Sequence, residues 1–188
     1  MMNNYYKAIP SEQMSDYQSF YELMAERLPD DCKIIEIGIS EGRSIIMMAS
    51  IMRHIGKRCR IWGVDNMDYG GESQRGIVIN HIIRSGEDVI TLVEKNSLDA
   101  SCDFPDDYFD LVFLDSSHTN QQTKAEIRLW IHKVKVAGTL AGHDYQYSGG
   151  VKDAVNELIS PESLVIHDTS FHLGVWAVEK TEDFKLLK

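Results

Sequence analysis

Residues 33–42 read KIIEIGISEG, an apolar strand that runs directly into a turn containing Gly38 and Gly42. Arg43 then opens a segment with helical periodicity. This order is typical of the start of a βαβ unit, in which glycine lets the backbone approach a ligand and the helix start favours an anionic group. A glycine turn can also be purely structural, so this stretch predicts the fold more firmly than the ligand.

The same alternation of Ile- and Val-rich strands with helical segments continues to residue 178 and predicts an α/β fold. The expected strands are residues 33–38, 60–65, 88–93, 110–115, 139–143, 163–167 and 174–179. The expected helices are residues 11–28, 43–55, 73–84, 119–134 and 150–158, with an irregular turn at 98–103. Only residues 168–173 connect the last two expected strands, which is too short a connection for two parallel strands. We therefore predict a doubly wound, mostly parallel seven-stranded sheet with an antiparallel C-terminal hairpin.

Length and composition predict one domain over residues 1–188, with a helical segment at 1–30 and a cofactor-binding core at 33–180. Lys and Arg number 19 against 29 Asp and Glu, and the resulting net charge of −10 argues against a nucleic-acid partner. No window approaches a signal peptide or a membrane span, and the three cysteines lack paired spacing. We expect a cytoplasmic protein with no membrane partner.

The spacing at the first turn distinguishes between cofactors. A dinucleotide fingerprint requires G-x-G-x-x-G, but Ser40 occupies its middle glycine position and no glycine follows Gly42 in the first helical turn. A nicotinamide cofactor is therefore disfavoured. The second strand ends at Asp65, whose carboxylate could accept both hydroxyls of a ribose; the alternative is an Asp that caps a loop.

Five motifs follow each other along the chain: EIGISEGRS at 36–44, VD at 64–65, NSLD at 96–99, FDLVFLDSSH at 109–118 and GTLAGHDY at 138–145. In this order and spacing they resemble class I S-adenosylmethionine-dependent methyltransferases with a Rossmann-like fold. They are most similar to small metal-assisted O-methyltransferases of the catechol and macrocin kind. The resemblance covers nearly everything after Lys33.

The resemblance implies the cofactor contacts. Gly38 and Gly42 would lie against the methionine part, Ser44 would bond its carboxylate, and Glu36 would support the turn. Asp65 would hold the ribose, and the residues after the second and third strands would border the adenine. The implied set is Glu36, Gly38, Gly42, Ser44, Asp65, Asn66, Met67, Asn96, Ser97 and Asp115.

Asp115, His143 and Asp144 end two expected neighbouring strands, which lie about 4.8 Å apart in a sheet, and resemble a site for Mg²⁺ or Mn²⁺. The catechol-like enzymes have an Asp-Asn pair where this chain has His143-Asp144 or, with the alignment moved by one residue, Asp144-Tyr145, and they have a Lys where His118 stands. An imidazole with a pKa near 6.5 can deprotonate a hydroxyl, so His118 is the candidate catalytic base. Asp115, on the same loop, is the second candidate catalytic residue. The alternative is a loop histidine that caps the next helix.

These features predict methyl transfer from S-adenosylmethionine to a small molecule, at a hydroxyl oxygen. Residues 116–118 lack an Asn-Pro-Pro-Tyr type of loop, which would resemble enzymes that methylate amino groups of bases or of glutamine. The alternatives are a non-catalytic S-adenosylmethionine-binding module and a nicotinamide-dependent enzyme. The acceptor would contact the N-terminal helix, residues 68–76 and residues 145–149. If the N-terminal helix does not pack on its own core, an apolar surface for a homo-oligomer would be formed by Tyr5, Tyr6, Tyr17, Phe20 and Tyr21.

Overall fold

The computed structural model of the chain describes residues 4–10, 18–68, 71–146, 150–168 and 174–188. A seven-stranded sheet with the order β3-β2-β1-β4-β5-β7-β6 runs through them. Its strands are β1 (Cys32–Ile37), β2 (Cys59–Asp65), β3 (Ile90–Glu94), β4 (Phe109–Leu114), β5 (Val134–Gly142), β6 (Leu164–His167) and β7 (Val175–Glu179).

Strands β1 to β5 pair in parallel, whereas β7 pairs antiparallel with β5 on one side and with β6 on the other. The chain therefore reaches the sheet edge at β6 and returns one position inward. This arrangement confirms the predicted fold class, including the C-terminal hairpin.

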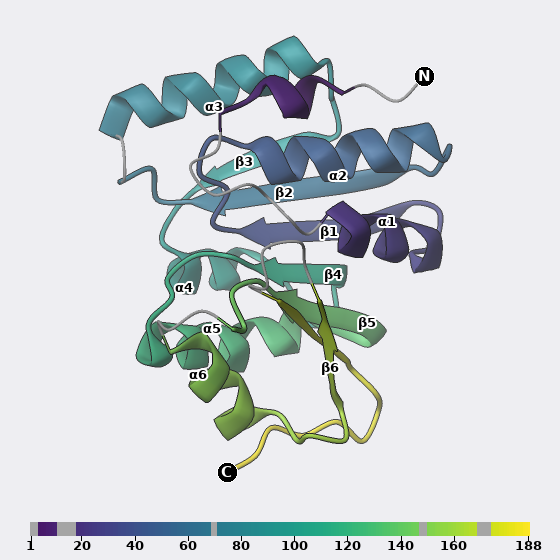
Figure 1. Cartoon of the computed structure of the whole chain (residues 1–188), viewed down its shortest axis with the longest axis vertical. Coiled ribbons are helices and arrows are strands. Elements are labelled where there is room, and N and C mark those ends of the chain that lie inside the picture. Colours follow the sequence, from purple (N-terminus) through teal and green to yellow (C-terminus); the bar gives the residue numbers. More distant parts are fainter. Residues whose placement is uncertain (1–3, 11–17, 69–70, 147–149, 169–173) are drawn as a thin grey trace.

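Helices cover both faces of the sheet because the strands are apolar on both faces. The helices are α1 (Gln18–Arg27), α2 (Arg43–His54), α3 (Gly71–Ser85), α4 (Ser97–Ala100), α5 (Asn120–Lys133) and α6 (Val151–Leu158), with 3₁₀ turns η1 (Tyr5–Ala8) and η2 (Ser101–Asp103). Helices α1 to α3 lie in the upper half of Figure 1 and α4 to α6 in the lower half. Alternate residues of β1 enter opposite cores: Ile34 packs with α1 and α2, and Ile35 with α5 and α6.

The start of β5 differs from the prediction. Residues 134–138 belong to the strand, which was expected to begin at residue 139, and α5 ends at Lys133. Val134 pairs with Phe109, the register then shifts before Leu111, and Ala137 has a φ of 64°. Helical periodicity in the sequence continues to residue 134, past the end of α5. The helix stops at Lys133 because Val134 pairs with β4, and the sequence does not reveal this pairing.

The N-terminal segment packs on the chain's own core. Tyr6, Phe20 and Tyr21 are each at most 2% exposed and belong to the core on the α1–α2 side of the sheet. The condition for an oligomer surface at these side chains is not met, so that expectation is wrong for them. Residues 11–17, the first part of the expected helix, lie outside the described residues, as does Tyr17.

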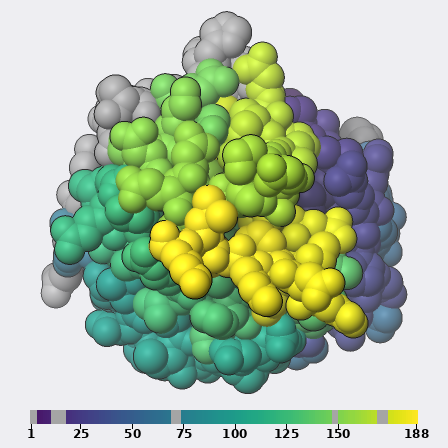
Figure 2. All heavy atoms as spheres, turned by 90° about the horizontal axis from the view of Figure 1, so that it is seen from below, coloured from purple at the N-terminus to yellow at the C-terminus, as the bar shows by residue number. Residues whose placement is uncertain are grey.

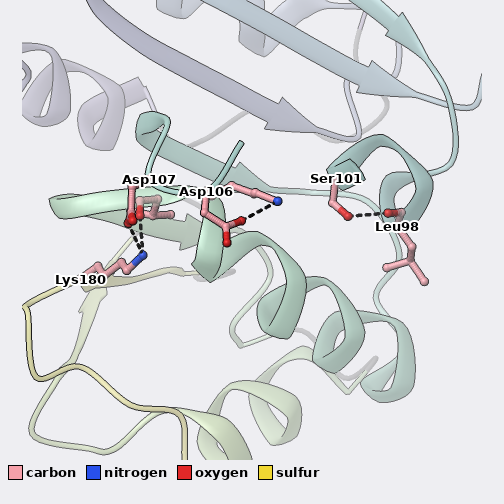
Figure 3. Close-up of polar contacts among 7 residues, drawn as sticks. Leu98, Ser101, Asp106, Asp107 and Lys180 are labelled. Atoms are coloured by element: carbon pink, nitrogen blue, oxygen red, sulfur yellow. Dashed lines mark hydrogen bonds and ion pairs between the residues drawn. The ribbon is translucent and has the colours of Figure 1, made fainter. Parts of the chain in front are cut away.

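The C-terminal residues close the face of the sheet that α5 and α6 cover. In Figure 2 they lie, in yellow, beside the yellow-green segment that holds α6 and β6, and Leu187 N–H donates to the Leu158 carbonyl at 2.8 Å. Lys180 points toward Asp107 in Figure 3, with its Nζ 2.8 Å from Asp107 Oδ1 and 2.7 Å from the Val134 carbonyl. These contacts tie the end of β7 to the turn before β4.

Two further properties agree with the composition. Among the described residues, no helix is long and apolar enough to cross a lipid bilayer. All three cysteines are free thiols; Cys32 and Cys59 are buried, and Cys102 is exposed.

Candidate active site

The turn after β1 is shaped by its two glycines. Gly38 has a φ of 86°, and a Cβ there would lie 2.2 Å from the Asp115 carbonyl oxygen. Gly42 has a φ of 84° at the start of α2, and a Cβ there would make ordinary van der Waals contact, with Val78 Cγ1 nearest at 3.5 Å. Gly38 therefore lets the β1 turn contact the backbone of Asp115, which brings two of the predicted site segments together.

Asp65, at the end of β2, holds that turn directly. Its Oδ2 accepts hydrogen bonds from the N–H groups of Ile39 at 3.0 Å and Ser40 at 3.1 Å, and its Oδ1 accepts one from Met67 N–H at 2.8 Å. The carboxylate thus lies beside the glycine turn, as predicted. It also caps backbone groups, which was the alternative interpretation.

Glu36 and Ser44 form a buried network under the turn. Ser44 Oγ donates to Glu36 Oε1, and the Tyr21 hydroxyl donates to Glu36 Oε2 at 3.0 Å. Burial raises the pKa of Glu36 to about 8, although the two hydroxyl donors oppose this shift. Glu36 therefore lies in contact with the start of α2 through Ser44, and its second donor is Tyr21, which the sequence indicated only as part of an apolar surface.

The expected adenine-side residues follow β2 and β3, which are neighbours in the sheet. Asn66 donates to the Asp68 carboxylate at 2.8 Å, and the Asn96 side chain accepts from Leu98 N–H at 2.9 Å as the N-cap of α4. Met67 and Ser97 are buried. These four side chains lie at the same edge of the sheet as the glycine turn, and two of them have local structural partners.

Asp115, His118 and Asp144 meet where β4 and β5 end. One ligand atom from each lies within 4.8 Å of the other two, a spacing that suits a metal ion. His118 Nε2 is 2.8 Å from Asp144 Oδ2, and His143 Nδ1 is 3.4 Å from Asp144 Oδ1 and 3.7 Å from Asp115 Oδ1. All three residues of the predicted metal site are therefore neighbours, and the group of ligand atoms with this spacing contains His118 in place of His143.

The charges in this cluster reinforce each other. The hydrogen bond that His118 Nε2 donates to Asp144 raises the pKa of His118 above its ordinary value, although burial opposes this shift. Burial would raise the pKa of Asp144, but its pairing with the two histidines outweighs burial and lowers this pKa. Burial would lower the pKa of His143, but its interactions with the Asp115 and Asp144 carboxylates outweigh burial and raise this pKa to about 10. The two carboxylates therefore favour positive charge at this position, whether on an imidazole or on a bound cation.

Asp144 itself carries two marks of a functional position. It has a left-handed φ of 58°, which is uncommon for a residue other than glycine. Its Oδ1 is buried and accepts no hydrogen bond from the described residues, although it faces His143 Nδ1. A carboxylate oxygen in this state is suited to a cation, since buried charges are normally paired or coordinate metals.

A small cleft borders the cluster. Its lining includes Ser116, His118, Glu126, His143, Val151 and Trp176. Glu126 is 2% exposed and had not been predicted as a site residue. The only signal in the sequence was an acidic residue within the apolar stretch of the helix at 119–134.

Comparison with known proteins identifies the family. A family model described as a methyltransferase domain matches residues 35–145, which is more than half of the chain. The chain belongs to this methyltransferase family. The predicted class I S-adenosylmethionine-dependent methyltransferase is thereby confirmed, and the matched residues contain the glycine turn, Asp65 and the Asp115–Asp144 cluster.

Solved structures share the fold of this methyltransferase at low sequence identity. An O-methyltransferase from Bacillus cereus in complex with SAH has a TM-score of 0.68 and 17% identity, over 93% of this chain and 86% of that chain. An rRNA methylase from Streptococcus thermophilus has a TM-score of 0.64 and 13% identity, over 92% of this chain and 100% of that chain. A search of curated protein sequences found no significant match. The fold is thus shared by proteins described as acting on different acceptors.

Proposed function

We propose that this methyltransferase transfers a methyl group from S-adenosylmethionine to a hydroxyl oxygen of a small molecule, with a divalent cation assisting. The observation that carries the proposal is the Asp115–His118–Asp144 cluster, which lies against the glycine turn because Gly38 contacts the Asp115 backbone. A cofactor on that turn would place its methyl group next to groups that can orient and deprotonate a hydroxyl.

A methyl group on a sulfonium is already activated, so the protein mainly aligns the reactants and removes a proton. In the proposal, the methionine part lies against the turn that contains Gly38 and Gly42, beside the start of α2, which has no side-chain cap. Asp65, already fixed by three backbone N–H groups, presents its carboxylate to the ribose. The SAH complex of the Bacillus cereus protein supports this choice of cofactor.

Asp115, His118 and Asp144 fit a divalent cation, with His143 directly beside them. The fit rests on the buried Asp144 Oδ1, which has no hydrogen-bond donor among the described residues. Carboxylate oxygens suit Mg²⁺, and an imidazole ligand shifts the preference toward Mn²⁺. A bound cation would lower the pKa of the acceptor hydroxyl and fix its direction.

The small-molecule acceptor is supported by the net charge of −10, which would repel a phosphate backbone. Because one structural neighbour is described as an rRNA methylase, RNA belongs in the test. Parts of the expected acceptor segments, residues 11–17, 69–70 and 147–149, lie outside the described residues. The acceptor class is therefore tested by a methyl-transfer screen of phenols, sugars and hydroxy acids, with RNA fragments as the contrasting set.

Calorimetry with SAH tests the cofactor assignment. The wild-type protein should bind SAH and not NADH. Asp65→Ala should weaken SAH binding by about 1.5 kcal/mol or more, the scale of a hydrogen bond to a charged group. Unfolding of the variant is measured in parallel, because Asp65 also holds the turn. Unchanged SAH affinity in a folded Asp65→Ala protein would exclude Asp65 from the cofactor site. If the wild-type protein bound SAH but methylated no acceptor, a non-catalytic binding module would be favoured instead.

His118→Gln tests the proposed base. The variant should bind SAH normally, while the single-turnover rate at neutral pH falls by about 10²- to 10⁴-fold, the usual contribution of a general base. The rate should recover partly at higher pH as the acceptor hydroxyl ionises unaided. Mn²⁺ titration of both proteins separates two roles: retained Mn²⁺ affinity indicates the base, and lost affinity indicates a metal ligand. A near-normal rate would exclude His118 from both.

A further inference from the structure

A buried carboxylate on α5 joins two loops of the active site. Glu126 Oε1 accepts a hydrogen bond from Ser97 Oγ at 2.5 Å and another from Ser116 Oγ at 2.6 Å. Gln122, one turn earlier on the same helix, donates its Nε2 to both Glu126 Oε1 and Ser97 Oγ at 3.1 Å. A single oxygen atom therefore receives three donors from α5 and from the loops that follow β3 and β4.

The two serines are neighbours of predicted functional residues. Ser97 follows Asn96 at the expected adenine edge, and Ser116 follows Asp115 of the cation cluster. Thr123 Oγ1, also on α5, donates to the Ser117 carbonyl at 3.2 Å and so holds the same loop. Within the described residues, no other side chain shown to hydrogen-bond to Ser97 also bonds to Ser116, so Glu126 is the direct link between the two loops.

Burial makes this link sensitive to substitution. Glu126 is 2% exposed, Ser97 is 8% exposed and Glu126 borders the cleft beside His118. A hydrogen bond to an ionised acceptor is stronger than one between neutral groups, and hydroxyls left without an acceptor in a buried site favour rearrangement of their loops. Loss of the carboxylate would therefore displace both loops together.

We propose that Glu126 is a positioning residue for catalysis, which sets the adenine-side loop at Ser97 relative to the Asp115 loop. The inference rests on the proposed function, because it requires S-adenosylmethionine to bind between these loops. It adds a residue that neither touches the cofactor nor belongs to the cation cluster, and that acts through two serine hydroxyls.

The test compares Glu126→Ala with Glu126→Gln. In the alanine variant both serines lose their shared acceptor, and SAH affinity and the single-turnover rate should each fall by about tenfold or more, as when the hydrogen-bond partner of a ligating group is removed. In the glutamine variant one amide oxygen can still accept both hydroxyls, so SAH affinity should return to within about threefold of wild type. Ser97→Ala combined with Ser116→Ala should reproduce the alanine result even if Glu126→Ala does not fold.

Glu87→Ala and Glu87→Gln are matched controls. Glu87 is a buried carboxylate that accepts a serine hydroxyl, from Ser50 at 2.8 Å, but it lies before β3 and is not part of the cleft. These controls should lose stability and keep SAH affinity. Equal SAH affinity in wild type, Glu126→Ala and the double serine variant would overturn the inference alone, whereas a wild-type protein that does not bind SAH would overturn the proposed function together with it.

Discussion

Glu36 is a carboxylic acid enclosed by the protein, with hydrogen bonds from Tyr21 and Ser44 as its polar contacts. Its pKa of about 8 means that the folded protein holds this proton more tightly than the unfolded chain, where the ordinary value is 4.5. The contribution of Glu36 to the free energy of unfolding should therefore be highest below pH 4.5. It should fall as the pH rises from 4.5 to 8 and then level off.

Glu36→Gln checks this pH dependence, because glutamine stays neutral at every pH. Urea unfolding should show wild type losing stability relative to the variant across this window, by up to about 5 kcal/mol at the coefficient of 1.36 kcal/mol per pKa unit. At pH 4.5 the two proteins should differ little. Parallel stability curves for wild type and Glu36→Gln between pH 5 and pH 9 would show that Glu36 does not titrate in this range.

The β1–α2 turn combines two glycines that are required for different reasons. At Gly42 the obstacle to a Cβ is the positive φ of 84°, since the nearest side-chain atom would lie at an ordinary contact distance of 3.5 Å. At Gly38 a Cβ would collide with the Asp115 carbonyl oxygen at 2.2 Å, and the backbone of β4 cannot move without disturbing the sheet. The element as a whole therefore depends on close approach at one glycine and on backbone conformation at the other.

This difference predicts unequal costs. Gly42→Ala should destabilise the fold by about 1 kcal/mol, the cost of a left-handed residue. Gly38→Ala adds a backbone clash and should cost about 3 kcal/mol or more. Thermal and urea unfolding of the two variants provide the comparison, with each serving as the other's control. Equal losses would mean that the Gly38–Asp115 contact relaxes freely.

At the scale of the whole molecule, the site is a product of strand order. The residues that carry it lie far apart in the chain, at 36–44, 65–67, 96–97, 115–118 and 143–144. Parallel pairing of β1 with β2 and β4, and of β4 with β5, brings these segments to the same edge. The helices on the two faces stabilise this arrangement, and Glu126 shows that they also contribute contacts to the loops.

Much of this followed from the sequence alone, because it depends on local patterns. Apolar strands, helical periodicity and the short connection before β7 predicted the sheet and its hairpin. The methyltransferase family was predicted by the resemblance of five motifs. The positions of Asp115, His143 and Asp144 at the ends of neighbouring strands predicted their convergence, since parallel strands end at one edge.

Tertiary structure decided what depends on contacts between distant segments. The extension of β5 back to Val134 follows from pairing with Phe109, and the burial of Tyr6, Phe20 and Tyr21 follows from packing against the sheet. The preference for His118 over His143 beside Asp144 depends on side-chain directions at the ends of β4 and β5. Tyr21 and Glu126 became visible as site-supporting residues only in three dimensions, because a hydrogen bond between residues 15 or 29 positions apart leaves no periodic signal in the sequence.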